Sequence, residues 1–139
     1  MVQPVSAKQI AVSGLKAQRI RMNVIANNIA NAQTTRTRDG GPFRRQLVLL
    51  RGNQLKPGYN PETLGVRVKR IVDAPEPFRT VYQPEHPDAD ESGYVKYPNI
   101  SLAVEMVDLV SAQRAYEANI AVFVSDRRMN QQAQEIIRQ

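Results

Sequence analysis

Cysteine and tryptophan are both absent from the 139-residue chain, and histidine occurs only once. Without cysteine there is no disulfide framework and no thiolate metal site, and a lone histidine leaves a zinc site short of ligands. No stretch approaches the roughly 20 consecutive apolar residues that a membrane-spanning helix needs. The first eight residues lack the apolar segment of a secretory signal, so we expect any export to proceed without a cleaved signal peptide.

Recognisable catalytic motifs are missing as well. The chain has no nucleophile elbow, no phosphate-binding glycine loop and no zinc-protease pattern. The densest polar cluster, residues 84–91, contains His86, Asp88 and Asp90. These side chains could bind a divalent metal or act as acid and base, but their spacing fits neither a calcium loop nor a zinc site. The alternative is a proline-stiffened turn whose carboxylates cap backbone groups or face arginine.

Charge is distributed unevenly along the chain, whose net charge is +6. Residues 1–32 carry four basic groups and no acid, whereas residues 99–139 carry four basic and five acidic groups. A basic first segment beside a slightly acidic last one favours pairing between the two ends. Nucleic-acid binding is the competing interpretation, but no aromatic residues alternate with the basic ones to form a stacking platform.

The two ends of the chain predict amphipathic helices over about residues 6–32 and 99–137. At 1.5 Å per residue these helices would be roughly 40 Å and 55 Å long, too long for one small domain to bury. We therefore predict a mainly α fold with a small β element, in which the end helices pair as a coiled coil. The expected division is residues 1–34 and 99–139 for the helical core and residues 35–98 for the middle element.

Apolar residues at heptad-like spacing define the expected contact stripe of each helix. Gln18 interrupts the first stripe and Gln113 the second, while Gly14 is expected to let a neighbouring backbone come close. The first stripe is Ala11, Leu15, Met22, Ile25, Ile29 and Ala32, and the second is Leu102, Met106, Leu109, Tyr116, Ile120 and Phe123.

Glycine and proline divide the middle of the chain into short segments. Strands are expected at residues 43–51, 64–69 and 78–82 from their apolar content and alternation. Residues 83–98 contain Pro84, Pro87, Gly93 and Pro98, and are expected to be extended and mostly irregular.

The end of the first helix is rich in asparagine. Asn23, Asn27 and Asn31 lie four residues apart and so share one helical face. That face is either solvated or forms a row of amides that bond to neighbouring chains, where an unpaired polar group would be costly.

Several segments together resemble bacterial flagellar rod and hook proteins. Residues 10–19 and 23–32 resemble the N-terminal signature of that family, and residues 114–119 resemble its C-terminal signature. Residues 40–46 and 84–99 resemble the middle of the proximal rod members, although Gln83 and Glu85 depart from the expected pattern. The resemblance implies a structural subunit of the flagellar basal body, without catalysis, cofactor or metal.

The resemblance also implies location and partners. Such a subunit would lie in the rod that crosses the periplasm, be exported by the flagellar type III apparatus and transmit torque. Expected partners are other copies of itself, FlgB-like and FlgF-like rod subunits and a FliE-like adaptor, with no nucleic acid and no membrane span. The expected assembly contacts are Leu15, Met22, Asn23, Ile25, Asn27, Asn28, Ile29, Asn31, Leu109, Arg114, Tyr116, Glu117, Asn119, Ile120 and Phe123.

Overall fold

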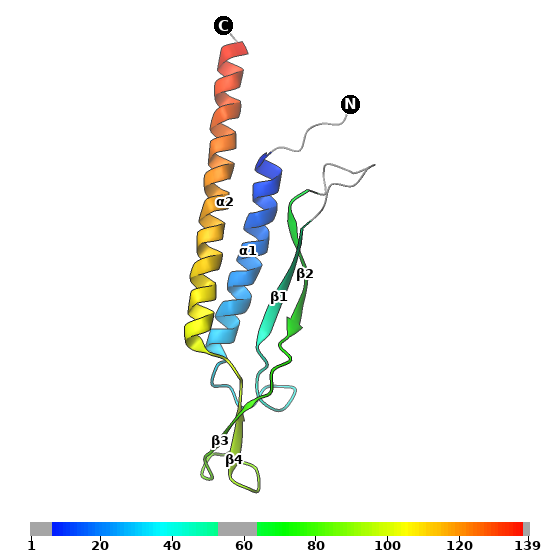
Figure 1. Cartoon of the computed structure of the whole chain (residues 1–139), viewed down its shortest axis with the longest axis vertical. Helices are drawn as coiled ribbons and strands as arrows, with labels where there is room; N and C mark the ends of the chain where they lie inside the picture. Colours follow the sequence, from blue (N-terminus) through cyan, green and yellow to red (C-terminus); the bar gives the residue numbers. More distant parts are fainter. Residues whose placement is uncertain (1–6, 53–63, 138–139) are drawn as a thin grey trace.

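Two long helices lie side by side in the computed structural model, with a β-hairpin against the shorter helix and a second hairpin beyond the lower end of the helix pair (Figure 1). The structure describes residues 7–52 and 64–137. It is mainly α with small antiparallel β elements, as predicted. The elements are α1 (Ala7–Ala30), β1 (Gln46–Gly52), β2 (Val66–Asp73), β3 (Arg79–Tyr82), β4 (Tyr94–Tyr97) and α2 (Leu102–Ile137).

The two helices run in opposite directions, and α2 continues well past the start of α1 (Figure 1). The ammonium of Lys8, in the first turn of α1, lies 5.6 Å from the centre of the Phe123 ring. The remainder of α2 has no described helix beside it, yet it stays helical to Ile137. No helix within the described residues combines the length and apolar character that crossing a membrane requires.

The contact face of α1 differs from the predicted stripe in one of its two columns. Buried or half-buried residues recur at alternating spacings of three and four, the period of a heptad seam. Gly14, Arg21 and Asn28 contact α2, and the predicted Leu15, Met22 and Ile29 are half-buried one position after each of them. Its members are Ala11, Gly14, Gln18, Arg21, Ile25 and Asn28.

The contact face of α2 is displaced in the same way. Leu102, Met106 and Ile120 from the predicted stripe are 45%, 60% and 40% exposed. Small and polar side chains let the helices approach closely, and the larger apolar residues of the neighbouring column are left beside the seam. The seam on α2 is formed by Glu105, Leu109, Ala112, Tyr116, Asn119 and Phe123.

The β1–β2 hairpin packs on α1, and α1 bonds to it near each end. β1 and β2 are antiparallel, with a bulge between Leu49 and Leu50. Near one end, the Asn28 amide bonds to both backbone groups of Gln46. Near the other end, the backbone N–H of Val66 donates to Ser13 Oγ at 3.1 Å.

Residues 83–98 are mostly irregular, as expected, but they also contain strand β4, which was not predicted. β4 pairs with β3, and Val95 and Tyr97 on it are buried. The turn before it forms because Asp90 Oδ1 accepts the backbone N–H groups of Ser92 and Tyr94, each at 2.9 Å. A side-chain cap of this kind carries no hydrophobic periodicity, which is why the strand was missed.

Helix boundaries agree with the sequence to within a few residues. α1 ends at Ala30, and residues 31–33 form a turn where the helix was expected to continue to residue 32. The predicted N-cap, Ser6, lies outside the described residues. The strands expected at 43–51, 64–69 and 78–82 correspond to β1, β2 and β3, with β2 continuing to Asp73.

Replacing Gly14 with alanine tests the close approach of the helices. A Cβ on Gly14 would lie 2.8 Å from Asn119 Cγ, and the Asn119 amide is itself held by Ala115 O at 2.7 Å. We expect Gly14→Ala to lower the free energy of unfolding by about 1–3 kcal/mol through overpacking. In an Asn119→Ala background the same change should instead stabilise the protein by about 1 kcal/mol, because alanine favours helix over glycine. Urea unfolding of the four proteins in the double-mutant cycle measures the sign change.

Candidate assembly interface

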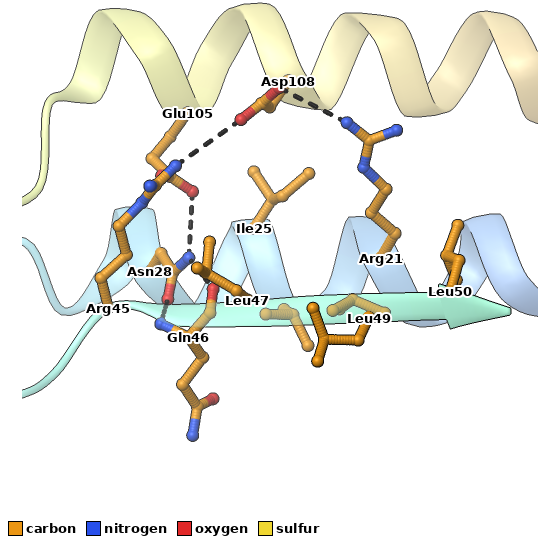
Figure 2. Close-up of a pocket in the computed structure, with 12 residues that line it drawn as sticks. Arg21, Ile25, Asn28, Arg45, Gln46, Leu47, Leu49, Leu50, Glu105 and Asp108 are labelled. Atoms are coloured by element: carbon orange, nitrogen blue, oxygen red, sulfur yellow. Dashed lines mark hydrogen bonds and ion pairs between the residues drawn. The ribbon is translucent and has the colours of Figure 1, made fainter. Parts of the chain in front are cut away.

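A buried polar junction connects α1, β1 and α2 where the chain enters and leaves its middle segment (Figure 2). Asn28, only 1% exposed, donates from Nδ2 to Gln46 O at 2.9 Å and to Glu105 Oε2 at 3.0 Å. Its Oδ1 accepts the Gln46 N–H at 2.9 Å. The Asn28 amide therefore pairs with β1 as a neighbouring peptide group would, while it also contacts α2.

The carboxylate of Glu105 is the charged centre of this junction. It is 1% exposed and accepts a 2.6 Å bond from Arg45 Nε, in addition to the bond from Asn28. A buried carboxylate needs such partners because removing its charge from water is costly. Glu105 lies in the first turn of α2, where the helix dipole also favours a negative charge.

A second carboxylate extends the junction toward the middle of the helix pair. Asp108 lies 3.4 Å from Arg21 Nη2 and 3.6 Å from Arg45 Nη2. Arg21 belongs to the basic first helix and Asp108 to the last helix, so the predicted charge pairing between the two ends is confirmed at this contact. Both partners are partly exposed, and the contribution of such a pair is modest, roughly 0–1 kcal/mol.

The predicted asparagine face is largely satisfied within the chain. Asn31 Nδ2 donates to both the backbone and the side-chain oxygen of Asn27, and Asn31 Oδ1 accepts from Thr34. Asn23 and Asn27 are exposed, and Asn28, which lies on another face, is the buried amide. Sequence reasoning missed Arg45, Glu105 and Gln46, for which no local pattern signals a shared contact.

The expected contact residues on α2 fall into three groups. Leu109, Tyr116, Asn119 and Phe123 lie in the seam, and Asn119 packs against Gly14. Arg114 lines a shallow hollow of about 440 Å³ together with Met106, Val107, Val110 and Ser111. Glu117 and Ile120 are exposed. On α1, Ile25 is buried in the seam, while Leu15, Met22 and Ile29 are half-buried beside it.

The side chain of Gln18 is an exception within the seam. Its Oε1 is buried without a hydrogen-bond partner among the described residues. Unpaired buried oxygens are uncommon in folded proteins, and this one interrupts the apolar column at the position where the sequence placed the interruption.

The acidic turn is a structural feature that connects the middle segment to the loop after α1. Asp88 pairs with Arg36 and accepts a 2.7 Å bond from the Thr35 hydroxyl, while Asp90 caps backbone N–H groups. His86 Nδ1 accepts the backbone N–H of Asp88 at 3.0 Å. The interpretation of the cluster as a turn whose carboxylates cap backbone groups and face arginine is confirmed. Within residues 7–52 and 64–137, no three histidine, cysteine or carboxylate side chains converge as metal ligands.

The comparisons with known proteins agree with this arrangement. A family model described as flagella basal body rod protein matches residues 9–36, which is α1 and the turn after it. A second model, described as flagellar basal body rod FlgEFG protein C-terminal, matches residues 91–136, from the turn before β4 to nearly the end of α2. A chain whose two end helices are matched by these two models is a structural protein of the flagellar rod.

Comparison with individual proteins indicates which kind of flagellar rod protein the chain is most similar to. The FlgC rod protein of Borreliella burgdorferi is 43% identical over 95% of this chain and 96% of its own length. Those of Yersinia enterocolitica and Bacillus subtilis are 47% and 38% identical, over 81% and 91% of this chain and 82% and 93% of their own lengths. The chain belongs to the FlgC family of flagellar basal-body rod proteins. It is thus a structural subunit of the basal-body rod and not an enzyme.

Replacing Asn28 with alanine tests the junction. The change would leave both backbone groups of Gln46 and the buried Glu105 carboxylate short of a partner. Because each unsatisfied buried group costs about 1–3 kcal/mol, we expect a loss of about 3 kcal/mol in the free energy of unfolding, measured with urea. Asn27→Ala is the matched control: its side chain is exposed one residue earlier, and its effect should stay within about 0.5 kcal/mol. Equal effects of the two changes would contradict the central role of Asn28.

The ion pair of the acidic turn predicts a pH dependence. The Thr35 hydroxyl bond, aided by the charge of Arg36, holds the pKa of Asp88 below its ordinary value of 3.8, against an opposing effect of burial. The stabilisation is therefore complete above that ordinary value and is lost as the pH falls through the lowered pKa. Asp88→Asn should melt at a lower temperature than the original protein at pH 7, and the difference should vanish once the pH has fallen through the lowered pKa of Asp88. Asp39→Asn, at an exposed site, should show no such convergence.

Proposed function

We propose that this subunit polymerises with other copies and with other rod proteins into a hollow shaft that crosses the periplasm and transmits torque. The observation that carries the proposal is the set of apolar side chains that α2 leaves exposed. Val107 is 70% exposed, Met106 60% and Ile136 74%. Extensive exposed apolar surface marks interaction sites, and among the described elements only α1 packs against α2.

The helix pair supports a coiled-coil core made of residues 1–34 and 99–139, with residues 35–98 as an outer element. Alternating spacings of three and four along both contact faces fit knobs-into-holes packing. The predicted contacts Leu15, Met22, Ile29 and Ile120 lie beside the seam and are available to neighbouring subunits. We assign the exposed Asn23 and Asn27 amides, with Arg114 and Glu117, to the same contacts.

Expected neighbours are FlgB-like and FlgF-like rod subunits and a FliE-like adaptor. We expect export by the flagellar type III apparatus, as membership of the FlgC family implies. The slender shape, with elements packed along one helix, offers little self-contained core. Assembly would bury apolar side chains that the single chain leaves exposed on α2.

A proline in the middle of α2 tests the role of this helix in assembly. Ile120→Pro removes a helix hydrogen bond and clashes with the preceding turn, at a cost of about 3 kcal/mol or more. We expect the variant to be made but absent from isolated basal bodies, with loss of swimming. Ile120→Leu should swim normally. Normal swimming with the proline variant present in the rod would contradict the proposal.

A further inference from the structure

The outer edge of β1 is open beyond its first residue. Arg45 O accepts the N–H of Ala74 across the hairpin at 2.7 Å, so the backbone groups of the next residue, Gln46, point away from β2, where Asn28 binds them. Antiparallel strands alternate strictly in this respect, so the backbone groups of Val48 also point outward. Among the described residues, none bonds to them.

The same alternation holds after the bulge. The Val66 N–H points outward to Ser13, and since Gly52 opposes Val66 and Leu50 opposes Val68, the backbone groups of Leu50 and Val68 point outward too. Along the groove, β1 thus presents the outward N–H and C=O groups of Val48 and Leu50. An unpaired edge of this kind is a template for another strand.

This edge forms one wall of a groove of about 360 Å³, shown in Figure 2. Val24 and Ile25 of α1 line it, and Asp108 of α2 forms part of the opposite side. β1 and α2 do not approach within 8 Å between Cα atoms at any pair of described residues. A strand added to the edge of β1 would lie about 4.8 Å from it, on a side where no Cα atom of α2 comes within 8 Å of β1.

The charges of the groove determine the character of its occupant. Arg21 and Arg45 already pair with Asp108 and Glu105 at 2.6–3.6 Å. An incoming charge would find no free counter-charge among these four groups and would lose its hydration. The apolar lining favours apolar side chains at alternate positions.

We propose that this groove binds an extended, uncharged segment of a neighbouring rod subunit, which adds to the edge of β1 as a third strand. The proposal rests on the proposed function, since it names one contact of the assembled rod. Main-chain bonds to Val48 and Leu50 would supply affinity, and the apolar lining would select the side chains. Asn28 marks where the added strand must end, because its amide already occupies the edge at Gln46.

A matched pair of proline variants tests the proposal in cells. Proline is tolerated on an edge strand where its missing N–H would face outward. Val48→Pro removes the free donor at the groove, whereas Val68→Pro removes an outward donor on the opposite edge of the same hairpin. Relative to the unmodified subunit, we expect Val48→Pro to reduce incorporation into basal bodies by about tenfold or more and Val68→Pro to change it by less than about twofold.

The possible results test strand addition separately from the proposed function. Equal incorporation of the two variants would overturn strand addition while leaving the proposed function intact, whereas absence of the unmodified subunit from basal bodies would overturn the proposed function itself. Circular dichroism of both purified variants checks that each hairpin folds.

A photoactivatable leucine at Leu50, which lines the groove, gives a readout that does not depend on the proline variants. In isolated basal bodies the cross-link should map by mass spectrometry to an extended, uncharged segment of an adjacent subunit. Cross-links confined to the same chain, or to a helix of a neighbour, would overturn the proposal.

Discussion

The fold depends on α1, which must pack against α2, β1 and β2 at the same time. These three elements contact α1 and not one another, apart from the pairing of β1 with β2. A 24-residue helix with three neighbours has little surface to spare. The Asn28 amide meets the constraint where three elements converge, since it mimics a peptide group toward β1 and donates to Glu105 of α2. Ser13 holds β2 with a single bond, because its hydroxyl oxygen accepts the backbone N–H of Val66. Directional bonds from α1 thus fix the position of a hairpin that apolar packing alone would leave free to slide.

The seam of this helix pair contains polar and small side chains, whereas large apolar side chains, which are expected in a seam, are exposed. The seam holds Gly14, Asn28 and Glu105, while Val107 and Met106 are exposed. Buried polar contacts contribute little net stability, but an incorrect register would leave them unpaired. The pair therefore specifies its alignment strongly and buries little apolar surface. Apolar surface is left for the neighbours that a rod subunit requires.

The sequence predicted the features that repeat along the chain and missed those that depend on contacts between distant residues. Heptad spacing located both helices and one correct column of each seam, which contains Ile25 and Phe123. Met106 was assigned to the other column because hydrophobicity favours large residues, but it is exposed, and the close approach of the helices requires small residues such as Gly14. Strand β4 depends on a turn capped by Asp90, and the pairing of Arg45 with Glu105 spans 60 residues. No local pattern contains such information.

The two hairpin edges show how a subunit can be ready to assemble without pairing indiscriminately. Exposed edges favour aggregation unless they are blocked or recessed. Here Asn28 and Ser13 each occupy one end of an edge, and both edges lie in grooves against α1. A chain that meets this hairpin in the wrong register or with a charged segment encounters an occupied position or an unfavourable lining. The side chains that hold the hairpin on α1 therefore also restrict what can bind beside it.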